Sequence, residues 1–122
     1  MSPRSSEFFE AAQRRLAGAV AVADHDPSTA LSAAYYAVLY AARAALSERD
    51  IHARKHRGTW HEFREAFVAR GLFDKALAER AQKLQPVREQ VDYDARQATP
   101  DQARDALSLA TEFVAAVARM LD

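Results

Sequence analysis

The chain has 122 residues, which suits one domain that buries roughly two-thirds of its unfolded surface without a disulfide or metal. It contains no cysteine, which excludes disulfides and thiolate metal sites, and no apolar run resembles a signal peptide or membrane span, so we expect a soluble, cytoplasmic protein. Lys plus Arg and Asp plus Glu number 17 each, so any binding of nucleic acid must come from a local patch.

Helix-favouring residues fill most of the sequence, and only three glycines and four prolines interrupt it, so the predicted fold class is all-α. Apolar residues at helical spacing predict a first helix from about Ser6 to Ala23. Asp26 is a good N-cap and Pro27 a good first helical residue for a second helix that ends near Glu48. Because the middle of this second helix is apolar nearly all round, we expect it to be central.

The periodicity lapses from residue 50 to 58, where we predict a connecting loop. Thr59, with Glu62 three residues later, has the pattern of a capping box and predicts a short third helix that ends at Gly71. Asp74 is expected to cap a fourth helix. Pro86 lies inside that helix and should kink it just ahead of Arg88.

Thr99-Pro100-Asp101-Gln102 combines an N-cap, a first-turn proline and a capping-box glutamine. It predicts a last helix with a continuous apolar stripe. The expected architecture is an antiparallel four-helix up-and-down bundle with one additional short helix, forming a single domain over residues 1–122.

The strongest indication of function is the hexapeptide Arg88-Glu89-Gln90-Val91-Asp92-Tyr93. Arg88 and Asp92 are four residues apart and share one helix face, while Tyr93 follows where the helical pattern ends. A guanidinium beside a carboxylate and a phenol could bind a phosphate. The same residues could form an ordinary ion pair that closes a helix.

A basic segment precedes the third helix. Residues 49–57 contain four cations and one acid, and the candidate phosphate or RNA ligands are Arg54, Lys55, His56 and Arg57. A solvated charged turn is the alternative. His52 and His56 would suit a metal only if the segment were helical, and no third ligand is evident, so we expect no metal site and no cofactor.

Aromatic residues occupy two turns of the second helix. Tyr35, Tyr36 and Tyr40 are interpreted as packing residues whose hydroxyl groups need partners. Arg43 is a cation on an otherwise buried helix, so it must extend to the surface or meet a carboxylate, for which Asp92 and Glu89 are candidates.

Three segments together resemble the HEPN-domain proteins, in particular the small stand-alone bacterial and archaeal ones. They are the run from Ala34 to Leu46, the His56-Arg57-Gly58 segment that leads to two phenylalanines and a glycine, and Arg88 with Asp92-Tyr93. The similarity spans about residues 30–117. Each motif is loose, but their order and spacing together are fairly specific.

The resemblance implies a helical bundle that dimerises with the arginine motif at the interface. It also implies frequent pairing with a separate minimal nucleotidyltransferase, often as a toxin and antitoxin. Many members are metal-independent endoribonucleases that use an arginine followed four to six residues later by a histidine. Arg88 matches this arginine, but Asp92 or Tyr93 occupies the position expected for the histidine.

That departure matters because proton exchange with a ribose 2′-hydroxyl suits a pKa near 6.5, the ordinary value for histidine. His56 of a partner subunit is one candidate replacement. The resemblance and this departure together imply a dimeric helical module that binds a nucleotide, RNA or a nucleotidyltransferase. An endoribonuclease toxin that uses Arg88, Asp92 and Tyr93 is the first alternative, and a purely structural bundle is the second.

Overall fold

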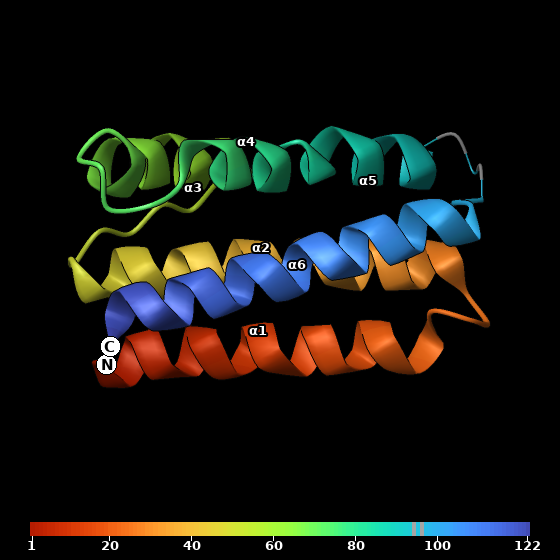
Figure 1. Cartoon of the computed structure of the whole chain (residues 1–122), viewed down its shortest axis with the longest axis horizontal. Helices are drawn as coiled ribbons and strands as arrows, with labels where there is room; N and C mark the ends of the chain where they lie inside the picture. Colours follow the sequence, from red (N-terminus) through yellow and green to blue (C-terminus); the bar gives the residue numbers. More distant parts are fainter. Residues whose placement is uncertain (94, 96) are drawn as a thin grey trace.

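Figure 1 shows the computed structural model of the chain, which describes residues 1–93, 95 and 97–122. These residues form helices and connecting segments with no strand, so the all-α prediction is confirmed. The elements are α1 (Pro3–Val22), α2 (Pro27–Glu48), α3 (His56–Phe63), a π-helical turn η1 (Arg64–Val68), α4 (Lys75–Gln82), α5 (Leu84–Tyr93) and α6 (Pro100–Leu121).

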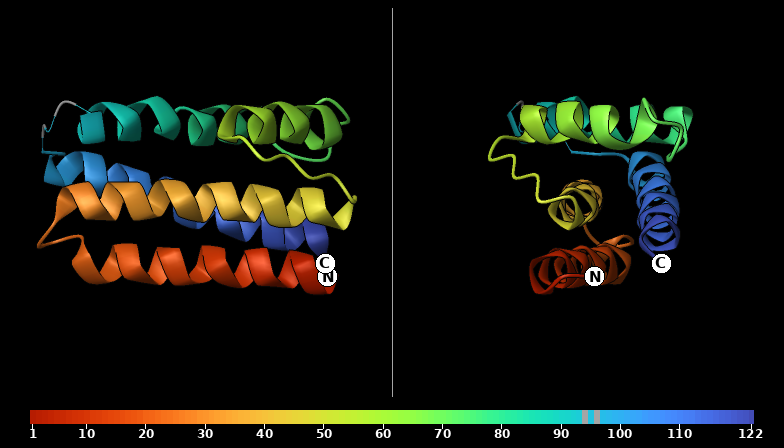
Figure 2. Two further views of the ribbon diagram at one scale, coloured as in Figure 1. Left: turned by 180° about the vertical axis from the view of Figure 1, so that it is seen from behind. Right: turned by 90° about the vertical axis from the view of Figure 1, so that its left-hand side faces the viewer.

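The helices lie in layers around α2. The short elements α3, η1, α4 and α5 form one layer, α1 lies on the opposite side, and α2 and α6 lie between them (Figure 1, Figure 2). Helix α2 contacts α1, α3, α5 and α6. The prediction that this helix is central is therefore confirmed, and thirteen of its 22 residues are buried.

Three predicted helix starts are confirmed by their capping contacts. The carboxylates of Asp26 and Asp74 accept hydrogen bonds from backbone N–H groups in the first turns of α2 and α4. Thr99 and Gln102 form the reciprocal capping box at the start of α6. These side chains satisfy donors that a helix N-terminus leaves without intrahelical partners.

The predicted start of the third helix is wrong. Helix α3 begins at His56, and Thr59 is a buried residue inside it, not its N-cap. The Thr59 hydroxyl donates to the carbonyl of Lys55 at 3.0 Å and accepts a hydrogen bond from Nε of Arg43 at 3.3 Å. The Thr59 hydroxyl, which the local pattern predicts as a helix cap, instead bonds to Arg43 of α2.

The fourth predicted helix is divided into α4 and α5 at Lys83, three residues before Pro86. Proline has no N–H for the carbonyl of Gln82, and its ring crowds that carbonyl, so α4 ends there. The interruption therefore precedes the predicted kink by about one turn. Pro86 occupies the first turn of α5, where the missing donor costs little.

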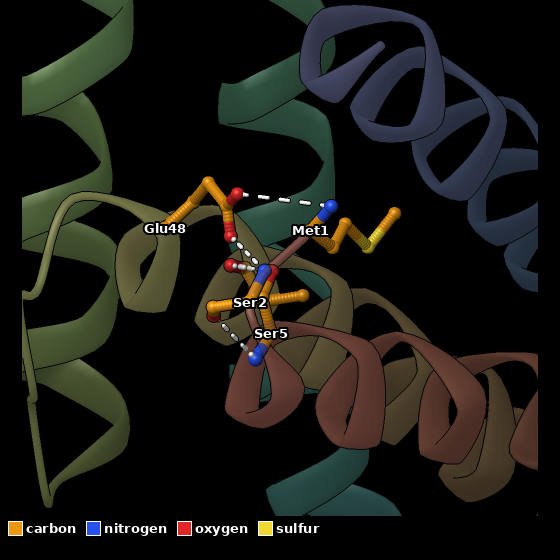
Figure 3. Close-up of polar contacts among 5 residues, drawn as sticks. Met1, Ser2, Ser5 and Glu48 are labelled. Carbon is orange, nitrogen blue, oxygen red and sulfur yellow. Dashed lines mark hydrogen bonds and ion pairs between the residues drawn. The ribbon is translucent and has the colours of Figure 1, made fainter.

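Polar contacts at one end of α1 fix it against α2 (Figure 3). The buried Ser5 hydroxyl donates to the carbonyl of Ala44 at 2.7 Å. The backbone N–H of Ser2 donates to the carboxylate of Glu48 at 2.9 Å, and the terminal ammonium of Met1 lies 3.9 Å from the same carboxylate. These contacts set the register of α1 along α2.

An aromatic cluster joins the short elements to α6. Its members are Trp60, Phe63, Phe67, Phe73 and Phe113, whose ring centroids lie 5.0–6.2 Å from their neighbours. Phe63 contacts the other four rings and has no exposed surface. No helix in the described part of the chain is long and apolar enough to cross a membrane.

We predict that Phe63→Ala lowers the free energy of unfolding by about 3–5 kcal/mol, because it leaves a cavity where four rings meet. Urea denaturation followed by circular dichroism measures this change. Leu72→Ala, at a residue that is 49% exposed, is the control and should cost clearly less. Equal losses in the two variants would contradict the placement of Phe63 in the core.

Candidate functional site

Two adjacent tyrosines on α2 form the floor of the candidate site. Tyr35 is fully buried and Tyr36 is half-buried, and their ring centroids lie 5.4 Å apart in an edge-to-face arrangement. Burial raises the pKa of the Tyr35 hydroxyl above its ordinary value, although the positive charge of Arg88 acts in the opposite direction. The hydroxyl therefore stays protonated and available for hydrogen bonding near neutral pH.

His56, the first residue of α3, lies on this tyrosine pair. Its Nδ1 atom is 3.0 Å from the Tyr35 hydroxyl oxygen. Its ring centroid is 5.7 Å from that of Tyr35 and 6.0 Å from that of Tyr36. The hydrogen bond orients the imidazole. In the tautomer in which Nδ1–H donates to the Tyr35 oxygen, the Nε2 atom has the free lone pair and can accept a proton.

Arg88 reaches the same tyrosines from α5. Its guanidinium carbon lies 5.3 Å from the ring centroid of Tyr35 and 5.4 Å from that of Tyr36. Its Nη1 atom donates to Asp92 at 2.9 Å, and only 16% of the side chain is exposed. Its Nε atom is buried without a hydrogen-bond partner among the described residues, so ring contacts and one carboxylate hold the guanidinium in place.

The surrounding charges favour the neutral form of His56. Burial is the largest cause that lowers its pKa below the ordinary 6.5, and the positive charges of Arg43 and Arg88 lower it further, while Glu89 opposes them. A neutral imidazole can accept a proton, and a guanidinium can bind a phosphate through two parallel hydrogen bonds. The candidate site thus contains one side chain that can accept a proton and one that can bind a phosphate.

The predicted trio of Arg88, Asp92 and Tyr93 is only partly brought together. The ion pair of Arg88 and Asp92 is present, as the four-residue spacing predicts. Tyr93 ends α5 with 91% of its surface exposed. All three line a shallow groove of about 700 Å³, but Tyr93 is not part of the packed tyrosine floor.

The predicted basic patch is divided among separate places. His56 belongs to the tyrosine floor. Arg54 lines a groove near the start of α1, whereas Arg57 lines another groove beside the α4 to α5 junction. Lys55 is exposed immediately before α3. The four residues therefore do not form one continuous phosphate site.

One interpretation of α2 needs correction. Instead of meeting Asp92 or Glu89, Arg43 donates to the Thr59 hydroxyl and, at 3.2 Å, to the carbonyl of Arg54. The interpretation of the three tyrosines as packing residues is confirmed: Tyr35 is buried in the core, and Tyr36 and Tyr40 are half-buried and pack against it. Residues 36, 40 and 43 recur at intervals of four and three, which places them on one face of α2. This spacing is the signal in the sequence that the three side chains face the same side of the helix.

Within one chain, His56 and Arg88 both lie near the rings of Tyr35 and Tyr36, while the contribution of His56 from a partner subunit stays a prediction. Across residues 1–93, 95 and 97–122, histidine and carboxylate side chains form no group of three or more that could hold a metal ion.

Comparison with protein families finds one match that covers nearly the whole chain. The model of the HEPN domain matches residues 4–120, an interval that contains both His56 and Arg88. No curated protein matches the chain significantly.

We predict that His56 makes the stability of the fold depend on pH. Because its folded-state pKa lies below the ordinary 6.5, the unfolded chain takes up the proton first as the pH falls. The stabilisation is complete above about pH 6.5 and is lost as the pH falls through the lowered folded-state pKa. Urea titrations should show this loss in wild type and not in His56→Gln. The same pH dependence in both proteins would contradict the assignment.

Proposed function

The chain belongs to the HEPN-domain family, and we propose that it is a metal-independent endoribonuclease in which Arg88 binds the scissile phosphate and His56 transfers the proton. One observation carries this proposal: both side chains contact the same pair of tyrosines, Tyr35 and Tyr36. The residue that the arginine motif lacks four to six positions downstream is thereby supplied from another helix.

The proposed reaction is an internal transesterification. The ribose 2′-oxygen attacks the adjacent phosphorus, the bond from phosphorus to the 5′-oxygen breaks, and the products are a 2′,3′-cyclic phosphate and a 5′-hydroxyl. His56 takes the proton from the 2′-hydroxyl, and the 5′-oxygen receives a proton from the imidazolium or from water. Arg88 stabilises the charge that develops on the phosphorane oxygens.

Asp92 acts as a positioning residue in this scheme. It accepts a hydrogen bond from Nη1 of Arg88, which leaves the other terminal nitrogen for a phosphate. Tyr93 is exposed in the same groove, where it can donate to an RNA oxygen or become the target of a partner transferase.

A second candidate function is a binding module without catalysis. Arg88 and Asp92 form an ion pair at 2.9 Å on one face of α5, and this contact favours a structural or interfacial role for the two residues. In that case the groove at the end of α5 binds a nucleotide or a nucleotidyltransferase and cleaves nothing.

We also propose that the protein forms a homodimer through the exposed end of α5. The family resemblance supports this assembly, and the exposure of Tyr93 beside the groove is compatible with it. A role in a toxin and antitoxin pair with a minimal nucleotidyltransferase rests on the resemblance alone. Light scattering tests the dimer, and a monomeric mass would remove it from the proposal.

We predict that wild-type protein cleaves single-stranded RNA in EDTA and leaves 2′,3′-cyclic phosphate ends. His56→Ala should slow the cleavage by about a hundredfold to ten-thousandfold, the usual contribution of a proton-transfer group. Arg88→Ala should abolish it, because it removes the guanidinium that lies over both Tyr35 and Tyr36 and is proposed to bind the scissile phosphate. Gel analysis of end-labelled RNA measures both effects.

Arg104→Ala is the matched control, since it removes an exposed arginine of α6 and should retain full activity. An RNA with deoxyribose at the cleaved position should resist all the proteins. RNA profiles that match a no-protein control for wild type would eliminate the ribonuclease and favour the binding module. Equal cleavage by wild type and His56→Ala would reject His56 as the proton-transfer group.

A further inference from the structure

A ladder of aromatic rings and guanidinium groups leads from the candidate site across the face shared by α1 and α2. Arg15 lies over both Tyr36 and Tyr40, with its guanidinium carbon 5.3 Å and 5.8 Å from their ring centroids. Tyr40 stacks with Phe8 at 6.3 Å, and Arg4 lies over Phe8 at 5.7 Å. Because Tyr36 also carries Arg88, the ladder is continuous with the site.

These side chains are accessible from solvent. Arg4 and Arg15 are exposed, and the three rings of Phe8, Tyr36 and Tyr40 are half-buried. Half-buried aromatic faces and exposed guanidinium planes are the two kinds of surface on which unpaired bases stack.

The ladder ends at a strongly basic groove of about 580 Å³ between the start of α1 and the segment before α3. Its lining includes Arg4, Arg43, Arg54 and His52, and contains no carboxylate. Glu48 at the end of α2 is already paired with the N-terminal residues (Figure 3). The carboxylate of Asp50 lies 3.2 Å from His52, so the net positive charge of the groove comes from its three arginines. This charge favours a phosphate although the whole chain is neutral.

The two features are close enough to serve one strand. From Tyr36 to Leu46, the α2 residue that lines the basic groove, the distance along the helix is roughly 15 Å at 1.5 Å per residue. Glu7 is the acidic residue in the adjoining groove, which also contains Arg4, Phe8 and Tyr40. Glu7 and the Asp50 carboxylate beside His52 are outnumbered by Arg4, Arg15, Arg43 and Arg54, so the path is positive overall.

We infer that the protein binds single-stranded RNA along this path, with bases stacked at Phe8 and Tyr40 and a phosphate held by Arg4, Arg43 and Arg54. The inference rests on the proposed function in one respect, namely that the RNA at Arg88 is the same strand. It adds a binding surface on α1 and α2 that favours a single strand, because a duplex keeps its bases paired and cannot stack them on the ladder.

The test is fluorescence anisotropy with a labelled 2′-O-methyl RNA of about 12 nucleotides, a length within the usual range for single-strand sites. This probe has no 2′-hydroxyl and cannot be cleaved, so binding is measured apart from catalysis. The double variant Arg4→Ala/Arg54→Ala should reduce the slope of log affinity against log salt by about 1.4, or about 0.7 for each lost phosphate contact. Phe8→Leu/Tyr40→Leu should weaken binding by about fivefold to a hundredfold.

Arg14→Ala is the matched control, because it removes an exposed arginine of α1 that is outside the ladder. A blunt duplex of the same length should bind more weakly than the single strand. Wild-type affinity and salt slope in Arg4→Ala/Arg54→Ala, or in the charge reversal Arg54→Glu, would overturn the inference. So would equal binding of duplex and single strand, or no binding of the probe by wild type.

The outcomes separate this inference from the proposed function. Cleavage that depends on His56, together with unchanged binding in the arginine and aromatic variants, keeps the ribonuclease and rejects the path. Binding that depends on these variants, without any cleavage of ordinary RNA, keeps the path and rejects the ribonuclease.

Discussion

The arrangement of the whole site depends on the packing of Tyr35 and Tyr36 at the centre of the bundle. Helix α2 is surrounded by other helices, so its tyrosines hold fixed positions against α3 and α5. One tyrosine hydroxyl orients His56, and the two ring faces hold Arg88. Residues that are 21 and 53 positions from Tyr35 along the chain thereby meet on a rigid floor, which is the preorganisation that catalysis by positioning requires.

The same floor supports the proposed site, in which the arginine and the histidine come from two different helices. A proton-transfer group needs a suitable pKa and access to the reacting oxygen, and neither condition specifies the helix that carries it. Burial and two nearby cations lower the pKa of His56, so the neutral form is available near neutral pH. Asp92 has a structural role, because it accepts a hydrogen bond from Arg88 and orients the guanidinium.

Local signals in the sequence were sufficient for much of the fold. The helix caps follow from spacing alone, because each capping side chain bonds to a group only three residues away in the sequence. These side chains are Asp26, Asp74, Thr99 and Gln102. The pair of Arg88 and Asp92 is local in the same sense. The start of α3 was missed because Thr59 bonds to Arg43 across the bundle, and no local pattern reports that contact. The hydrogen bond between His56 and Tyr35 could not be predicted for the same reason, since it joins residues 21 positions apart in the sequence.

The central claim is that Arg88 and His56 form one electrostatic unit, and the pKa of His56 tests it most directly. Nuclear magnetic resonance of the labelled imidazole can follow this titration in wild type and in Arg88→Ala. The account predicts a pKa below 6.5 in wild type and a higher pKa in the variant, because the Arg88 charge disfavours the imidazolium. An unchanged pKa after removal of the guanidinium would contradict the account.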